Sequence, residues 1–493
     1  MWLTTITVGL VTLILIKWLN DYVKRWRMPP GPFFWPIIGN LSLFSGRMYL
    51  TFIDLAKTYG DVFSLKLGMT DVVVLNSLDA VKEAFMKKGA DFAGRPKMLS
   101  MDISSEGGKD IVFTDYNPTW KLHRKLFHGA IRGYASGQNL QSKVHESLKD
   151  TIAEFTKMEG QGVNLDDYLY QLVYNVICSA AFGVRYNMDE ENFKTLMKVS
   201  KDAAERFGQG FLADVYPLLR FLPSPTVTAC RKMMDQILGI MQCHLEQHKE
   251  TFDPSNLRDI TDHMIKAQKD AEEEGIQDIN SLTDTHLRQT ISDIFFGGTF
   301  SSIFSLRWAL LYLAVHPEIQ EKVAAELDSV VGRDRLPELS DREATPYMEA
   351  TMHEVMRMAS MDPLSLPHAT TVDTTLRGYQ IPKGTMVMPN LWALHHDPDT
   401  WGDPDVFRPE RFLDENGKPV KPAALMPFSA GRRACPGETL GKANNFLLLG
   451  GLVQNFRFSI SKGEGPPDLT PDEKGGGASC IPSPYKVVMT CRK

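Results

Sequence analysis

The residues best suited to chemistry in this chain surround one cysteine, in the segment Phe428-Ser-Ala-Gly-Arg-Arg-Ala-Cys-Pro-Gly437. A thiolate stays deprotonated where backbone N–H groups and positive charge lie nearby. The start of a helix provides both, and an apolar, helix-like run follows at residues 445–452. The glycines allow backbone to approach a flat ligand closely. Phe428 is placed to shield a soft metal–sulfur bond from water, so these residue types favour a metal-bound thiolate at Cys435.

The spacing Phe-x-x-Gly-x-Arg-x-Cys-x-Gly resembles the haem-binding loop of the cytochrome P450 family, and all five fixed positions match. The resemblance implies that Cys435 is the axial ligand of the iron of haem b, with Phe428, Arg433 and Gly437 beside the cofactor. It also implies a mostly α fold with a small β region. A lone cysteine in a glycine-rich turn is more often structural, and the length of the match argues against that alternative.

Five polar residues match positions at which this family holds the two haem propionates: Arg95, Trp120, Arg124, His368 and Arg433. Trp120 and Arg124 are spaced i, i+4 and so reach the same side of a helix. Arginine and tryptophan N–H groups suit carboxylate acceptors. Each residue alone would be an ordinary surface residue, but together they form a consistent cofactor-binding set.

Glu354 and Arg357 place a carboxylate and a guanidinium at i, i+3 on one face of an expected helix. On a surface such a pair contributes only about 0.3–0.5 kcal/mol. Arg411 offers a second cation for the same carboxylate. The family resemblance implies that these three form a buried structural triad behind the cysteine loop.

Residues 292–310 are expected to form the long helix that crosses the haem on its oxygen-binding side. Gly297 and Gly298 each cost about 1 kcal/mol in a helix interior relative to alanine, and their use is to open space. The alternative is that the two glycines mark a flexible helix end. The family pattern Ala/Gly-Gly-x-acid-Thr appears here with Phe300 in place of the acid and Ser301 in place of threonine. Phe300 cannot relay a proton, which leaves Ser301, Gly297 and Gly298 as the predicted catalytic positions.

The replacement of the acid by Phe300 leaves three functions to consider. If Ser301 and water suffice, the protein is a monooxygenase driven by NADPH. If proton delivery fails, a hydroperoxide isomerase or lyase that needs no external electrons becomes attractive. The third is a non-catalytic protein that binds haem and lipid.

We place the monooxygenase first because basic residues remain on the presumed proximal face, where they would steer an acidic flavoprotein. These are Lys121, Lys125, Lys418, Lys421, Arg432 and Lys442. The resemblance implies NADPH-cytochrome P450 reductase as the electron donor, with cytochrome b5 as a second candidate partner. The alternative is that these six residues are ordinary surface residues that keep the protein soluble.

Within the family, residues 88–98, 390–396 and 401–412 most resemble microsomal steroid 17α-hydroxylase/17,20-lyase and its neighbours, and the aryl-hydrocarbon hydroxylases share much of the same sequence. The resemblance implies a hydrophobic, steroid-like or other lipid substrate. Its implied pocket comprises Ser104, Val112, Phe113, Arg206, Phe300, Met361, Asp362, Leu364, Cys480 and Ile481, beside Gly297 and Ser301.

Two of these pocket residues depart from the steroid enzymes. Arg206 stands where they have an amide, and Asp362 where a small apolar residue is usual. A buried carboxylate needs a partner, so an Arg206–Asp362 pair, or Arg206 binding a substrate carboxylate, stays open. Phe296, Phe300 and Phe304 are spaced to form an aromatic ridge, a pattern more typical of core packing than of substrate contact.

The N-terminus indicates a membrane anchor. Residues 2–16 are uncharged and apolar, which is short for a span of about 20 residues, so a signal peptide is the alternative. No basic segment precedes the run and no small-x-small cleavage site follows it. The basic residues on its C-terminal side are Lys17, Lys24, Arg25 and Arg27, which favours retention of the remaining chain in the cytoplasm. We expect an endoplasmic reticulum anchor and basic flank at 1–27, a proline-rich hinge at 28–39 and a haem domain at 40–493.

The composition fits this reading. The 493 residues contain 43% hydrophobic residues, and no linker or composition shift divides the chain after residue 40. The net charge of −6 gives no sign of nucleic-acid binding. No GxGxxG or P-loop motif is present, so nicotinamide and flavin chemistry are expected in a partner. The six cysteines are too sparse for a disulfide scaffold, which fits a reducing, cytosol-facing setting.

Periodicity predicts strands at 62–67 and 71–75 and helices at 140–158, 165–182 and 233–248. The charged run 270–275 is expected to be a loop. His244 and His248 are expected on a polar helix face rather than at a zinc site.

Overall fold

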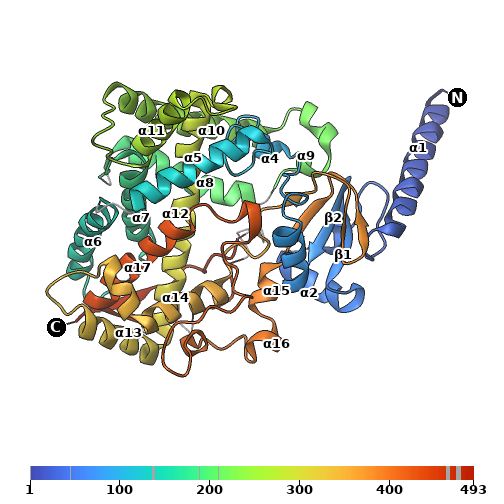
Figure 1. The fold of residues 1–493 in the computed structure, drawn as a ribbon. Coiled ribbons are helices and arrows are strands. Elements are labelled where there is room, and N and C mark those ends of the chain that lie inside the picture. The colour runs from blue at the N-terminus through green and yellow to red at the C-terminus, as the bar shows by residue number, and fades with distance from the viewer. Residues whose placement is uncertain are drawn as a thin grey trace.

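The computed structural model describes residues 2–492 except 45, 136–138, 188, 209, 462–466 and 473–478. Helices build most of the body, and a small sheet lies at the side from which the first helix projects (Figure 1). This architecture confirms the predicted mostly helical fold with a small β region.

The helices begin and end as follows. They are α1 (Trp2–Lys24), α2 (Met48–Tyr59), α3 (Leu78–Val81), α4 (Leu99–Ser104), α5 (Pro118–Ala135), α6 (Asn139–Lys157), α7 (Asp166–Phe182), α8 (Glu191–Gly208), α9 (Leu212–Val215), α10 (Pro225–Glu250), α11 (Ile260–Glu273), α12 (Asp284–Val315), α13 (Pro317–Val330), α14 (Pro346–Ala359), α15 (Leu391–His395), α16 (Pro398–Trp401) and α17 (Glu438–Asn455). Short 3-10 turns include Pro409–Phe412 and Gly431–Arg433.

Local signals explain many of these boundaries. Proline is the first residue of α5, α10, α13 and α14, where its missing N–H is not needed and its fixed φ favours the helix. Ser224 caps α10 through its side chain, and Gly183 ends α7 in the left-handed conformation with φ 69°.

The predicted helices agree with α6, α7 and part of the longer α10, and the predicted oxygen-side helix is the central part of α12. The loop predicted at 270–275 is wrong, because α11 continues to Glu273. Ala271 of this turn is buried, and Lys266 forms an ion pair with Asp270 over 2.6 Å. Burial of an apolar face and an i, i+4 charge pair therefore outweigh the local charge run.

Three sheets accompany the helices. The largest has the order β1 (Val62–Leu67), β2 (Thr70–Leu75), β7 (Met386–Pro389) and β4 (His368–Ala369). The two predicted strands are β1 and β2, and they form an antiparallel hairpin in which Leu67 pairs with Thr70. The others are β3 (Gly162–Val163), β9 (Val487–Cys491) and β8 (Phe456–Ile460), and the pair β5 (Thr374–Leu376) and β6 (Tyr379–Ile381).

Helix α12 lies at the centre of the main hydrophobic core, where α7, α10, α14 and α17 pack against it. Nearly all of its second half is buried, including Trp308 at 1% exposure. It is apolar and long enough to cross a membrane, but 72% of its most apolar window is buried inside the protein, so it is a core helix.

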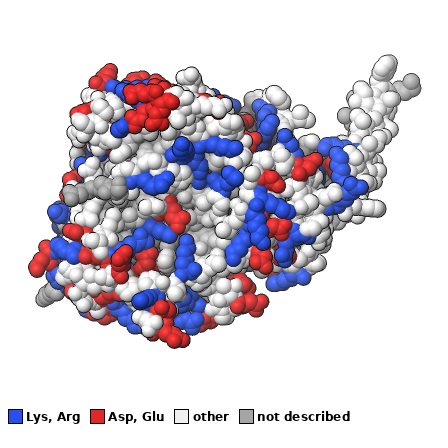
Figure 2. Space-filling view, viewed as in Figure 1, with Lys and Arg blue, Asp and Glu red and all other residues white. Residues whose placement is uncertain are grey.

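Helix α1 projects from the body (Figure 1), and the part that projects shows no charged atoms on the face seen in Figure 2. Its 23 residues span about 35 Å at 1.5 Å per residue, enough for a membrane core. None of its apolar window is buried. These features are consistent with membrane anchoring. The base of the helix is docked, because Trp18 Nε1 donates to Phe34 O over 3.0 Å and Asp21 pairs with Lys66 over 3.1 Å.

The two histidines of α10 do not lie on a polar face as predicted. His244 and His248 are 9% and 6% exposed. His244 Nε2 lies 2.9 Å from the Tyr186 hydroxyl, and His248 Nε2 lies 2.7 Å from Asp259, the residue that caps α11. The pair therefore joins α10 to its neighbours.

Candidate functional site

Cys435 lies between the short turn Gly431–Arg433 and the first residue of α17. Its backbone N–H donates to Phe428 O over 2.9 Å, which closes the cysteine loop. Gly431 has φ 73°, and a Cβ atom there would lie 1.9 Å from the carbonyl oxygen of Phe85. Only glycine fits this close approach.

The surroundings of the Cys435 thiol combine burial with positive potential. Burial raises the pKa of the thiol, whereas the Gly437 backbone N–H and the Arg124 guanidinium lower it. Arg124 also donates to the carbonyl oxygen of Ala434. Cys435 is accessible to solvent although protein atoms surround it. A metal bound there would complete the positive environment that a thiolate requires.

The five predicted propionate contacts come together beside this loop. The guanidinium of Arg433 lies 3.8 Å from the centre of the Trp120 ring, and that of Arg124 lies 5.3 Å from it. Arg95 Nε donates to Val112 O over 2.8 Å, and Arg433 Nη2 donates to Thr114 O over 2.7 Å. Segments far apart in the chain thus bring these side chains together.

Burial lowers the pKa of Arg433 to about 8, helped by the charges of Arg95 and Arg124. Burial likewise lowers the pKa of Arg95, and that of Arg124, to about 10 each. Such a crowd of buried cations is stabilised by an anionic ligand. The donor set therefore fits the carboxylates of a haem.

Two members of this set differ from the predicted picture. Trp120 Nε1 donates to Ile111 O over 2.9 Å, so its N–H is directed to backbone. Burial and the charges of Arg95 and Arg433 hold the pKa of His368 well below its usual range, so this imidazole is neutral. It stacks on Phe85 at 4.0 Å, with Nδ1 2.8 Å from Phe92 O.

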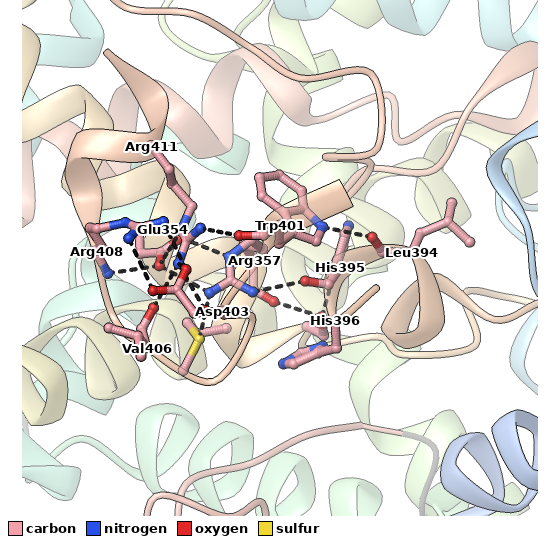
Figure 3. A network of polar contacts seen from close by, with 12 residues as sticks. Glu354, Arg357, Leu394, His395, His396, Trp401, Asp403, Val406, Arg408 and Arg411 are labelled. Atoms are coloured by element: carbon pink, nitrogen blue, oxygen red, sulfur yellow. Dashed lines mark hydrogen bonds and ion pairs between the residues drawn. The ribbon is translucent and has the colours of Figure 1, made fainter. Parts of the chain in front are cut away.

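The Glu354–Arg357–Arg411 triad forms as predicted and is buried (Figure 3). Glu354 accepts hydrogen bonds from Arg357 Nε at 2.7 Å and from Arg411 Nε at 3.0 Å. The backbone N–H of Arg408 also donates to this carboxylate, over 2.8 Å. The triad thus fastens the turn Pro409–Phe412 to α14.

His395 links the triad to the cysteine loop, a role that the sequence analysis missed. Arg357 Nη1 donates to His395 O over 2.8 Å (Figure 3). The His395 ring lies 2.7 Å from Ser360 Oγ and accepts from Met426 N over 3.0 Å. Burial lowers the pKa of His395 to about 3, so the ring is a neutral connector. No local pattern marks such a bridge, because its partners are distant in sequence.

The predicted oxygen-side segment of α12 contains two accessible positions. Ser301 and Gly297 are accessible within an otherwise largely buried helix, and Ser301 Oγ donates to Gly297 O over 2.6 Å. A Cβ at Gly297 would meet nothing within 4 Å, whereas one at Gly298 would lie 2.8 Å from Ile177. Gly297 therefore leaves open space, and Gly298 allows α12 to approach α7 closely.

The aromatic ridge predicted on α12 is present. The ring of Phe300 lies 6.3 Å from that of Phe296 and 6.0 Å from that of Phe304. Phe304 is buried, and the other two are partly buried against the same core. The Phe300 side chain thus replaces an acid with part of a packed apolar layer.

Several predicted pocket residues converge on α12. Cys480 N donates to Met361 O over 2.7 Å, Ser305 Oγ lies 3.3 Å from Met361 Sδ, and Trp308 Nε1 donates to Cys480 O over 2.9 Å. Met361 and Ile481 pack against the main core.

Other predicted pocket residues lie in different surroundings. Leu364 and Cys480 pack into the cluster under the large sheet. Ser104 Oγ donates to Ser100 O within α4. Arg206 belongs to α8, and its side chain lies outside the described residues.

A half-buried carboxylate missed by the sequence analysis, that of Asp293, joins the loop containing Val112 and Phe113 to α12. Asp293 accepts from Ile111 N over 2.8 Å, and Asp110 accepts from Phe113 N over the same distance. Burial and the charge of Asp110 raise the pKa of Asp293 well above its usual value. The feature of the sequence that could have identified Asp293 is its position one helical turn before Gly297.

Comparisons with known proteins agree with this geometry. The family profile described as Cytochrome P450 matches residues 29–489. The chain is 34% identical over 490 residues to the steroid 17-alpha-hydroxylase/17,20 lyase of Ictalurus punctatus, covering 98% of this chain and 95% of that relative. It is 34% identical over 485 residues to cytochrome P450 1A1 of Rattus norvegicus, with coverage of 95% and 92%. A zebrafish cytochrome P450 solved with progesterone superposes with a TM-score of 0.82 and 32% identity, covering 90% of this chain and all of that one.

Proposed function

Because the chain belongs to the cytochrome P450 family, whose members bind haem through a cysteine thiolate and receive electrons from a redox partner, we propose that it inserts one oxygen atom from O2 into a steroid-like or other lipid substrate. The observations that carry this proposal are the accessible Cys435 in the loop before α17 and the accessible Ser301 in the otherwise largely buried α12. The relatives named for steroid oxidation support the substrate class.

Cys435 is the proposed iron ligand, and thiolate-bound haem supplies the activation of dioxygen. Arg95, Arg124 and Arg433 would hold the propionates by charge-assisted hydrogen bonds. Phe428 shields the sulfur, and the Glu354 triad with His395 fixes the loop from behind. These residues position the cofactor without taking part in proton transfer.

Ser301 is the proposed group that holds water and oxygen on the distal side. Its hydroxyl donates to Gly297 O, so its lone pairs remain free to accept from a water in the space that Gly297 leaves. Phe300 supplies no proton, and the proton that reaches the site therefore travels through water held by Ser301.

The electron donor proposed is NADPH-cytochrome P450 reductase, with cytochrome b5 as a second partner. Lys and Arg gather over α5 on the face seen in Figure 2. Of the six basic residues predicted there, Lys121, Lys125, Lys418, Lys421 and Arg432 are exposed, while Lys442 pairs with Glu438 over 2.6 Å. A basic surface of this kind attracts an acidic flavoprotein.

We propose that residues 1–27 anchor the protein in the endoplasmic reticulum membrane, that 28–39 form the hinge and that 40–493 form the cytoplasmic haem domain. The basic residues after α1 support this orientation. Because Trp18 and Asp21 contact the body, the anchor sets the tilt of the domain at the membrane.

The test is product analysis in paired reactions with a steroid panel and fatty-acid hydroperoxides. One reaction contains NADPH and reductase, and the other contains neither. Oxygenated product that requires NADPH supports the monooxygenase. Product from hydroperoxide alone would indicate an isomerase or lyase, and ligand binding without any turnover would indicate a carrier.

A further inference from the structure

The start of α11 brings two carboxylates to one histidine of α10. His248 Nε2 lies 2.7 Å from Asp259 Oδ2, and Asp262 lies in the first turn of α11, which Asp259 caps. One ligand atom from each of these three residues lies within 4.8 Å of the others, and all three residues are buried. The α10 and α11 helices pack against each other, and neither carries the cysteine loop (Figure 1). The group is therefore separate from the haem site.

The second ring nitrogen of His248 determines which nitrogen is available to a ligand. Nδ1 lies 2.7 Å from the backbone oxygen of His244. A carbonyl oxygen only accepts hydrogen bonds, so Nδ1 carries a proton and donates it, and Nε2 is the nitrogen that offers a lone pair. Histidines that bind metals usually donate their other N–H to a carbonyl or a carboxylate, because this bond fixes the tautomer and the ring orientation.

The two carboxylates keep the capacity to bind a further group. Asp259 Oδ1 accepts from the backbone N–H of Asp262 over 3.0 Å. Arg258 donates to Asp262 from Nε over 2.6 Å and from Nη2 over 2.9 Å, and the Arg258 side chain is 39% exposed. A carboxylate offers about four acceptor positions, so these bonds leave positions unused on both acids.

A buried hydroxyl near Asp259 lacks a partner. Tyr134 is 1% exposed, and its hydroxyl has no hydrogen-bond partner among the described residues. The α5 helix, which carries Tyr134, packs against α11. Burial, and in second place the charge of Asp259, raise the pKa of Tyr134. Buried polar groups are normally satisfied by protein or by ordered water, and a hydrated metal ion beside Asp259 would provide such a partner.

We propose that His248, Asp259 and Asp262 form a binding site for a divalent transition metal ion, for which zinc is best suited. One imidazole nitrogen and two carboxylate oxygens are ligand types that zinc accepts, whereas magnesium and calcium favour oxygen ligands alone. The ion takes the place of the proton between Nε2 and Asp259, which leaves to solvent, and water fills the fourth position. In a tetrahedral zinc site the 2.7 Å contact of His248 with Asp259 opens by roughly 0.6 Å.

The bound ion joins the last turns of α10 to the first turn of α11. A metal that binds only the folded protein stabilises it, so zinc raises the midpoint of thermal unfolding. This site does not depend on the oxidative function proposed above, and its outcomes are the same whether or not the protein oxidises any substrate.

The test uses the purified full-length protein in detergent. It is loaded with haem, so that Cys435 is not available to zinc, and is treated with a chelator before zinc chloride is titrated. Competition with a fluorescent zinc chelator gives the affinity. We expect His248→Gln and Asp262→Asn each to lower it at least about a hundredfold, beyond the loss that removal of an outer-shell partner causes. His244→Gln, one turn earlier on α10, is the matched control and should retain the affinity.

Arg258→Met should change the zinc affinity in the opposite direction. The substitution removes a positive charge that competes for Asp262, and we expect an increase of about tenfold. A purely structural role of this group predicts no such increase. X-ray absorption at the zinc edge should show nitrogen and oxygen ligands at about 2.0–2.2 Å and no sulfur at about 2.3 Å, which excludes binding at the exposed Cys243.

Equal zinc affinity in the unaltered protein and in both ligand variants would overturn the proposal, as would sulfur ligands or the absence of zinc binding. Saturation by magnesium at the same concentrations as zinc would also overturn it, because it would indicate general attraction to acidic groups. If a ligand variant does not fold, the affinity of Arg258→Met and the absorption spectrum of the unaltered protein decide the outcome.

Discussion

Ser301 Oγ donates to the carbonyl oxygen of Gly297 over 2.6 Å, one turn earlier in α12. The hydroxyl thus satisfies a backbone group beside two glycines and keeps its own capacity to accept hydrogen bonds. The hydroxyl of nearby Thr299 is buried and has no hydrogen-bond partner among the described residues, whereas Ser301 is accessible. Ser301, and not Thr299, is therefore the hydroxyl available to substrate-side water.

Replacing Ser301 with alanine should lower product formation on the order of a hundredfold, because a positioned proton-transfer group contributes at least that much. NADPH consumption should continue, with peroxide as the product of uncoupled turnover. The measurement is the ratio of product to NADPH consumed. Ser301→Thr is the matched control, and a normal ratio in Ser301→Ala would contradict the assignment.

Introducing an acid by Phe300→Glu should raise the same ratio, since it adds a proton donor to the helix beside Ser301. The substitution also removes one ring from the Phe296–Phe300–Phe304 ridge. Phe300→Gln is therefore the control for lost packing. Equal ratios in the glutamate and glutamine variants would show that proton supply does not limit turnover.

Cys435→Ser should abolish the absorbance band typical of thiolate-bound haem in the reduced, carbon-monoxide-bound form. The hydroxyl is similar in size but does not ionise at neutral pH, so the change tests the ligand and not the fold. Cys243→Ser, at an exposed cysteine, should leave the band intact. A retained band in Cys435→Ser would place the ligand elsewhere.

Glu354→Gln should prevent accumulation of haem-loaded protein. It leaves the buried Arg357 and the nearly buried Arg411 without their shared carboxylate, a loss of about 3–5 kcal/mol for a broken buried pair. Haem content and thermal unfolding measure the effect. Asp403→Asn, which removes a half-exposed partner of Arg411, is the control and should be nearly neutral. Similar losses of haem content and thermal stability in both variants would show that the carboxylate of Glu354 contributes no more than that of Asp403.

The contact between His248 and Asp259 should make stability depend on pH. Burial lowers the pKa of His248, but the hydrogen bond and charge of Asp259 raise it to a net value above the ordinary one. The stabilisation is therefore fully present below the unfolded pKa of about 6.5 and is lost as pH rises through the folded pKa. Thermal unfolding between about pH 6 and 9 should show this loss in the unaltered protein and not in His248→Gln. Parallel curves for both proteins would contradict it.

The sequence by itself determined the features that depend on short-range pattern. The cysteine loop, the glycine pair, the Glu354–Arg357 spacing and the helical periods at α6 and α7 all act over a few residues, so a linear reading finds them. The family assignment follows from the same motifs, which also located Arg95, Arg433 and Arg411.

Only the tertiary structure determined which titratable side chains are charged and which distant side chains are in contact. Burial makes His368 neutral, and burial against a neighbouring acid turns His248 into an interhelical contact. His395 bridges Arg357 to Met426 across long stretches of chain. Such relationships depend on desolvation and on the packing of distant segments, and neither is encoded by the residues next to them in sequence.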